Sequence, residues 1–192
     1  MPRKLLITLI LILFLFPFIS WYYLQRGLDW RKEAQEIMKG SQPFPTGQWQ
    51  DISDKKFSSG QLEGNVTLVT YISCENPQQQ SDLLNAFYLQ FKESKKAYFI
   101  ILDTCSTTSF TSDPTKINWH IFSCSDSVDL CNRLYAEWPA GKNHALVDRH
   151  QKIRSYYASG TEEEKRILLE HMALLLPRER SDKVELKRGE NK

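Results

Sequence analysis

The sequence has little excess charge, few cysteines and few residues that break secondary structure. Its 192 residues include 25 basic and 23 acidic side chains. This balance argues against a nucleic-acid-binding domain, which needs a basic face to neutralise phosphates. Four cysteines in a chain of this length are too few for a disulfide scaffold. With eight glycines, eight prolines and 41% apolar residues, the chain fits neither a collagen-like nor a disordered class.

Several motifs of well-known enzyme classes are also missing. The chain contains no GxSxG, no P-loop, no HExxH and no CxxC sequence. A hydrolase or a kinase is therefore the least expected class. The length favours one domain of ordinary size.

One long apolar run lies near the N-terminus, from Leu5 to Leu24. Twenty residues in a helix span roughly 30 Å, the thickness of a membrane hydrocarbon core. The run ends in an aromatic cluster suited to the headgroup boundary, Trp21, Tyr22 and Tyr23. A cleaved signal peptide would need small residues there. The sequence therefore predicts an uncleaved N-terminal transmembrane helix as the membrane anchor over residues 1–24.

The rest of the chain divides into three parts by composition. Residues 25–48 form a polar connector rich in glycine and proline, which is typical of a linker. Residues 49–176 carry the apolar periodicity of a compact domain. The charged tail, residues 177–192, has almost no apolar content and is expected to be disordered.

The compact region alternates strand and helix patterns. Its order is strand, helix, strand, strand, helix, hairpin, helix, which predicts a layered α/β fold with a central mixed sheet. A closing antiparallel hairpin beneath a last helix is the thioredoxin-like plan. Residues 54–64 fit an added N-terminal ribbon and short turn. The predicted strands cover residues 65–72, 97–102, 119–123, 144–147 and 152–157.

The three helices are predicted from their caps and apolar faces. Asn76 is expected to cap the first helix, and Thr161 with Glu164 forms a capping box for the last. The expected faces are Leu83, Leu84, Phe87 and Phe91 in the first helix; Val128, Cys131, Leu134, Tyr135 and Trp138 in the second; and Ile167, Leu168, Met172, Leu174 and Leu175 in the third.

Four pieces of the chain carry a family likeness. They are the anchor, KKFSSGQLEGNVTLVTYISC (55–74), AYFIILD (97–103) and ALVDRHQKIRSYYASG (145–160). In these pieces the sequence resembles the Sco/SenC family of membrane-anchored thioredoxin-fold proteins, which is associated with copper delivery to cytochrome c oxidase. The resemblance implies a single-pass membrane protein whose domain lies on the extracytoplasmic (periplasmic) side. It also implies a membrane protein client, such as a respiratory oxidase subunit.

Three features depart from this expectation. The basic residues that follow the anchor would by themselves place the domain in the cytoplasm; we keep the extracytoplasmic side because of the resemblance. The family pattern has two cysteines four residues apart, whereas this chain has Cys74 and then Gln78. The family histidine position falls near Ala140, and His144 lies closer to the strand. Copper is thus a possible cofactor with an incomplete ligand set, and no metal ligand is assigned.

Cys74 is the candidate catalytic thiol. It lies where a strand gives way to a helix, and the helix dipole would favour its thiolate. Tyr71 stands where a peroxiredoxin would have threonine. The alternative for Cys74 is a buried cysteine left from a lost site.

The other cysteines and the histidines give weaker signals. Cys105 and Cys124 each follow a predicted strand, and they lie at the same end of the sheet as Cys74 if these strands are parallel. They are candidate partner thiols, in a Cys74–Cys105 or a Cys105–Cys124 disulfide. Cys131 reads as a core residue. The four histidines show no ligand spacing, and His150 is expected to be solvated in a turn.

Two functions follow from this reading. The first is a Sco-like protein that assists cytochrome c oxidase assembly through thiol or copper handling at Cys74. The second is a non-catalytic interaction domain of thioredoxin fold, tethered to a membrane complex. A non-enzymatic role is favoured, with thiol–disulfide activity through Cys74 as the enzymatic alternative.

Overall fold

The computed structural model describes residues 3–74, 77–105, 115–116 and 118–177, and of residues 3–11, 77 and 128 it describes the backbone alone. The predicted cap Asn76 and nearly all of the charged tail lie outside these residues. The chain separates into two compact units, Met1–Gly40 and Ser41–Lys192. The boundary thus falls inside the predicted linker.

The first unit consists of one helix, α1 (Arg3–Ile37). It covers residues 3–24 of the predicted anchor and continues through much of the predicted linker. The side chains of residues 5–11 of that anchor lie outside the described residues. Across the part of the chain that is described, no helix is both long enough and apolar enough to cross a membrane.

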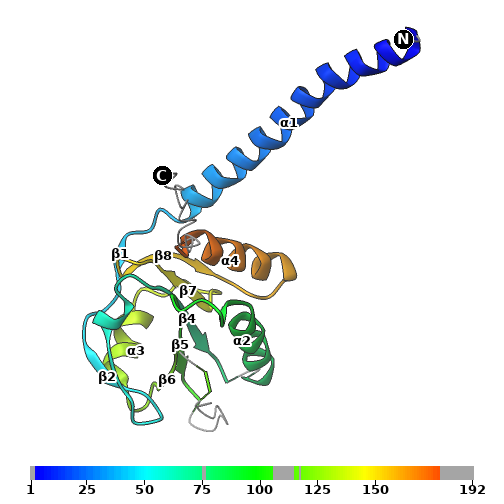
Figure 1. Cartoon of the computed structure of the whole chain (residues 1–192). Coiled ribbons are helices and arrows are strands. Elements are labelled where there is room, and N and C mark those ends of the chain that lie inside the picture. Colours follow the sequence, from blue (N-terminus) through cyan, green and yellow to red (C-terminus); the bar gives the residue numbers. More distant parts are fainter. Residues whose placement is uncertain (1–2, 75–76, 106–114, 117, 178–192) are drawn as a thin grey trace, which may run out of the picture. The chain divides into compact units, whose positions relative to one another are not determined.

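The second unit is built on a mixed six-stranded sheet with the order β1-β8-β7-β4-β5-β6 (Figure 1). β4, β5 and β6 are parallel, whereas β7 runs antiparallel to β4 and β8. This topology confirms the predicted thioredoxin-like α/β fold. The strands are β1 (Gln42–Pro43), β4 (Val66–Ile72), β5 (Ala97–Asp103), β6 (Trp119–Ser123), β7 (His144–Val147) and β8 (Lys152–Tyr157).

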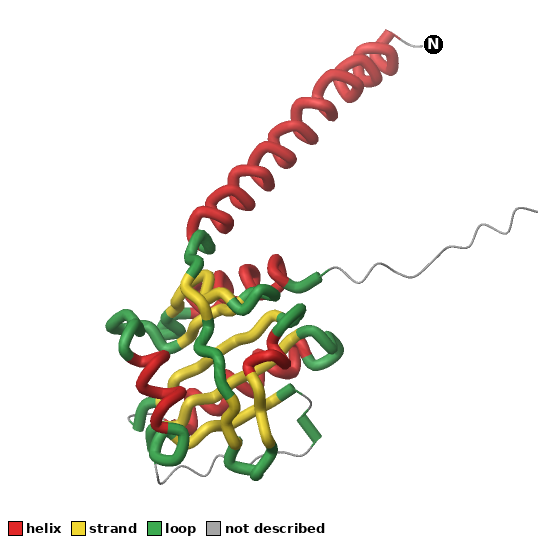
Figure 2. The backbone as a smooth tube through the Cα atoms, turned by 90° about the vertical axis from the view of Figure 1, so that its left-hand side faces the viewer, coloured by secondary structure: helices red, strands yellow, loops and turns green. Residues whose placement is uncertain are grey.

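Helices cover both faces of the sheet, as the two views of the backbone show (Figures 1 and 2). Helix α3 (Val128–Tyr135) contributes Leu130 and Leu134 to a core that includes Val69, Ile100 and Phe122. Helices α2 (Pro77–Phe91) and α4 (Glu162–Leu175) lie on the opposite face. There, the ring of Phe87 lies 6.0 Å from that of His144. Strand side chains point alternately to the two faces of a sheet. Because helices cover both faces here, most residues of β4 and β5 are buried.

A small hairpin lies beside the outer strand β6. It pairs β2 (Gln48–Gln50) with β3 (Lys56–Ser58) and leads into a 3-10 turn, η1 (Ser59–Leu62). β3 and η1 confirm the ribbon and turn predicted over residues 54–64, and the partner strand β2 lies before that range. The hairpin loop contacts β6 directly, because the Ile52 amide donates to the Ile121 carbonyl oxygen at 2.9 Å.

Helix α3, the second of the three predicted helices, is shorter than its apolar pattern predicts. It ends at Tyr135, which is 58% exposed, and Trp138 lies beyond it. Trp138 precedes Pro139, and a residue before proline is disfavoured in helical conformation. The Trp138 indole instead donates to the Lys142 carbonyl oxygen at 2.7 Å. Leu130, absent from the predicted face, is fully buried.

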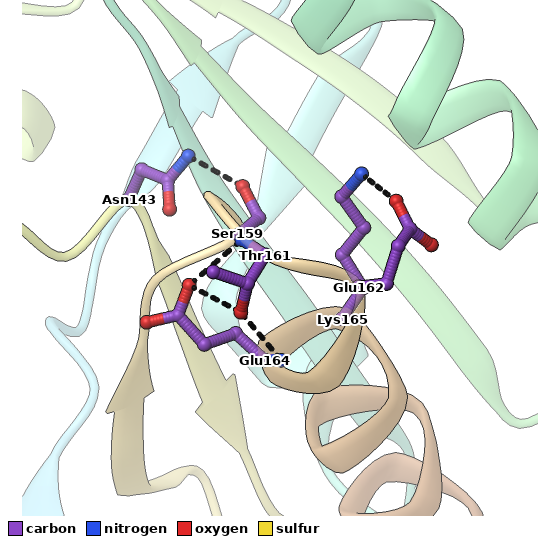
Figure 3. Close-up of polar contacts among 6 residues, drawn as sticks. All are labelled: Asn143, Ser159, Thr161, Glu162, Glu164 and Lys165. Atoms are coloured by element: carbon purple, nitrogen blue, oxygen red, sulfur yellow. Dashed lines mark hydrogen bonds and ion pairs between the residues drawn. The ribbon is translucent and has the colours of Figure 1, made fainter.

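The capping box of α4 is confirmed. The Thr161 hydroxyl accepts from the Glu164 amide, and the Glu164 carboxylate accepts from the Thr161 amide (Figure 3). Leu168 and Met172 are buried as expected, but Leu174 is 37% exposed. Leu174 lies six residues after Leu168, a spacing that places it on a different side of the helix from the buried face.

Candidate functional site

A disulfide joins the ends of two neighbouring parallel strands. Cys74 lies two residues beyond β4 and Cys105 two residues beyond β5, and the last pair in the register of these strands is Ile72 with Asp103. The cysteine Cα atoms are 5.4 Å apart, within the range that a disulfide requires. The structure thus contains one of the two expected pairings, and a second sulfur accompanies Cys74.

The two sulfur-bearing residues differ in exposure. Cys74 is exposed to solvent, whereas Cys105 is only 6% exposed. The reading of Cys74 as a cysteine buried in a lost site is therefore wrong. In thiol–disulfide exchange, access decides which sulfur a second molecule can attack. An incoming thiolate can reach Cys74, and Cys105 would then be the leaving group.

Side-chain hydrogen bonds fix the backbone on both sides of this disulfide. Gln80, in the first turns of α2, accepts from the Ser73 amide and donates to the Ser73 hydroxyl, both at 3.1 Å. The Thr104 hydroxyl donates to the Ile72 carbonyl oxygen at 2.8 Å. Neither Gln80 nor Thr104 was identified from the sequence; the Thr104 bond joins two strand ends that lie 32 residues apart in the chain and meet only in the sheet. The position of Gln80 early in the helix after Cys74 was the one available signal.

The second disulfide corrects two sequence predictions. Cys124 is bonded to Cys131, with Cα atoms 5.6 Å apart, so the Cys105–Cys124 pairing is wrong. Cys131 is buried in the core as predicted, but it is also bonded. Helix α3 begins four residues after Cys124 and turns back, which brings its fourth residue close to Cys124. All four cysteines of the chain are thus in disulfides.

A groove of about 940 Å³ lies next to Ser73, at the end of β4. Its walls come from the end of β4, the start of α2, the loop before β7 and the start of α4. Ser73, the chain neighbour of Cys74, lines it, and so do the aromatic side chains Tyr71, Tyr135 and Trp138. The groove was not predicted, because its walls are far apart in sequence.

Polar side chains hold the far wall of this groove in place (Figure 3). The Asn143 side-chain amide donates to the Ser159 hydroxyl at 2.9 Å, which ties the loop before β7 to the segment after β8. Lys165 pairs with Glu162 at 2.6 Å in the first turn of α4. The groove therefore combines an aromatic side with a hydrogen-bonding side, a lining suited to an extended peptide segment.

Among the residues that the structure describes, the side chains do not fit a copper ion. Gln78, where the family has its second cysteine, is exposed and donates to Asp82. His144 is 1% exposed, and its Nδ1 atom lies 2.9 Å from the Thr70 hydroxyl. Over the described stretches of the chain, no group of three or more His, Cys, Asp or Glu side chains could hold a metal ion. No step of the chemistry below is therefore assigned to copper.

His144 instead predicts a pH-dependent stability. Burial lowers its pKa from 6.5 to about 3. Between these values the unfolded chain binds a proton at this residue and the folded chain does not, so stability falls as the pH drops below 6.5. Going from pH 7 to pH 5, this one residue should lower the free energy of unfolding by about 2 kcal/mol.

Urea unfolding at pH 7 and pH 5 checks this prediction. The His144→Gln variant can keep a hydrogen bond to Thr70 and has no proton to gain. Between pH 7 and pH 5 its free energy of unfolding should therefore fall by about 2 kcal/mol less than that of the unaltered chain. The other titrating groups are common to both proteins and cancel in the difference. Parallel pH dependences for the two proteins would contradict the prediction.

Comparison with known proteins shows which fold this is. No family model matches the chain, and no curated protein matches it. Solved structures do. A SCO1/SenC family lipoprotein from Bacillus anthracis is 17% identical, with a TM-score of 0.52, over 71% of this chain and 96% of that one. BsSco, a member of the Sco family of cytochrome c oxidase assembly proteins, is 16% identical, with a TM-score of 0.51, over 73% of this chain and 99% of that one.

Thiol–disulfide proteins match equally well. A putative thiol:disulfide interchange protein DsbE from Chlorobium tepidum is 14% identical, with a TM-score of 0.55, over 73% of this chain and 99% of that one. At these identities the likeness concerns the fold. The domain is a thioredoxin-like domain of the kind seen in Sco and thiol–disulfide interchange proteins, so the expected structural likeness to the Sco/SenC family is confirmed.

Proposed function

We propose that the chain exchanges disulfides with a client protein through Cys74 and Cys105. The observation that supports this most strongly is an exposed cysteine, Cys74, bonded to a buried one, Cys105, with the preceding residue Ser73 lining a groove. A client thiolate attacks the Cys74 sulfur, and the electron pair of the S–S bond leaves on Cys105. A second client thiol then displaces Cys74, so the client gains a disulfide and the domain holds two thiols. The reverse sequence reduces a client disulfide.

The setting of this exchange is part of the proposal. Residues 1–24 would anchor the protein in a membrane, with the domain on the extracytoplasmic side, where disulfides persist. The client would then be a membrane protein, and a respiratory oxidase subunit is the client class that the names of the Sco neighbours suggest. Because the described donors do not fit copper, thiol handling is favoured over metal delivery.

A pair of single-thiol variants of the full chain tests the exchange. Both carry Cys124→Ser and Cys131→Ser; one adds Cys105→Ser and keeps Cys74, and the other adds Cys74→Ser and keeps Cys105. With glutathione disulfide as the probe, mass spectrometry should show mixed disulfide forming at Cys74 at least about tenfold faster than at Cys105, because only Cys74 is accessible. Equal rates, or a faster reaction at Cys105, would contradict the proposal.

A further inference from the structure

The second disulfide starts at the end of β6, the strand next to the one that precedes Cys105. Asp103 and Ser123 are paired in the register of β5 and β6, and a cysteine follows each strand. The Cys124 amide donates to the Asp103 carbonyl oxygen at 2.8 Å, and the Cys105 amide donates to the Asp103 carboxylate at 2.9 Å. One residue thus holds the backbone of a cysteine from each disulfide.

A small pocket of about 190 Å³ lies at this junction. Both Cys124 and Cys131 line it, and so does Thr104, whose hydroxyl is 4.0 Å from the Cys105 sulfur. Cys124 is partly exposed, whereas Cys131 is buried. Unfilled space therefore lies beside the second disulfide and next to Thr104, the chain neighbour of Cys105, and Cys124 is the more accessible end of the second disulfide.

We propose that Cys124–Cys131 is an internal electron acceptor for Cys74–Cys105, an inference that rests on the exchange proposed above. After a client dithiol has reduced the first disulfide, the Cys105 thiolate attacks the Cys124 sulfur. A Cys105–Cys124 bond forms, the Cys124–Cys131 bond breaks, and its electron pair leaves on Cys131.

A second exchange completes the transfer. The Cys74 thiolate attacks the Cys105 sulfur, which restores Cys74–Cys105 and releases Cys124. The two electrons and two protons of the client dithiol end on Cys124 and Cys131, and the client keeps its new disulfide. The domain could then accept four electrons from client dithiols, and the exposed site would be oxidised again after its first turnover.

The intermediate of this relay can be trapped. In the full chain with Cys74→Ser and Cys131→Ser, only Cys105 and Cys124 remain. Under mild oxidation, peptide mass spectrometry should find these two residues joined by a disulfide. Two free thiols in the folded variant, verified by circular dichroism, would overturn the relay.

Kinetics separate the relay from the proposed function. Excess dithiothreitol is added to the full chain, and timed alkylation with mass spectrometry reports each cysteine. The Cys124–Cys131 bond should be reduced at least about tenfold faster in the unaltered chain than in the Cys74→Ser, Cys105→Ser variant. Equal rates in the two proteins would overturn the relay and leave the exchange intact. A Cys74–Cys105 bond that resists the reductant would overturn the proposed function itself.

Discussion

Replacing Cys74 by serine is expected to remove the catalysis of disulfide exchange. In the reduction of insulin by dithiothreitol, the full chain would pass electrons from dithiothreitol to insulin through its Cys74 thiolate. Serine is nearly the same size but does not form a thiolate or a disulfide. The catalysed rate should fall at least about 100-fold, to the level of dithiothreitol alone.

His150→Gln provides the matched control. His150 is exposed in the turn between β7 and β8, so its replacement should leave the rate unchanged. Insulin turbidity measured for the unaltered chain and both variants gives the answer. If Cys74→Ser keeps its full rate above background, the non-catalytic interaction domain becomes the better reading.

The second large effect concerns stability. The Cys74–Cys105 disulfide closes a loop of 31 residues, and Cys124–Cys131 closes one of 7. In the chain-entropy model, the longer loop should stabilise the fold by about 4 kcal/mol and the shorter one by about 2 kcal/mol. Replacing both members of the first pair by alanine should therefore be the more destabilising change.

Urea unfolding of the two double-alanine variants checks this difference directly. Each variant has the other disulfide intact, so each serves as the control for the other. A smaller loss of unfolding free energy for the Cys74, Cys105 pair would contradict the expectation. A large loss of unfolding free energy in the Cys74, Cys105 variant would also mean that a client that reduces this disulfide lowers the stability of the domain.

Local patterns in the sequence predicted most of the fold. The strands at 97–103 and 144–147 are apolar runs, and Thr161 with Glu164 is a cap that depends on residues three apart. Such signals need no knowledge of distant segments. The end of α3 was mispredicted because an apolar spacing continues to Trp138 even though Pro139 stops the helix.

The site was predicted in part, and for a clear reason. Cys74 and Cys105 follow parallel strands, and parallel neighbours end at one edge, so their proximity could be inferred. The Cys124–Cys131 bond depends on how tightly α3 turns back after β6, which the sequence does not display. Gln78 stands where a second cysteine would follow Cys74 by four residues, and the partner sulfur comes instead from Cys105, just after the neighbouring strand β5.

The contact between the β2–β3 hairpin and β6 has a consequence for solubility. β6 is the last strand of its sheet, and an uncovered border strand can recruit strands from other molecules and start aggregation. The Ile52 amide occupies the Ile121 carbonyl oxygen that such a strand would use. At the opposite border, β1 has only two residues, too few to template an intruding strand. The chain itself thus limits strand addition at β6 and offers only a very short strand at the opposite border.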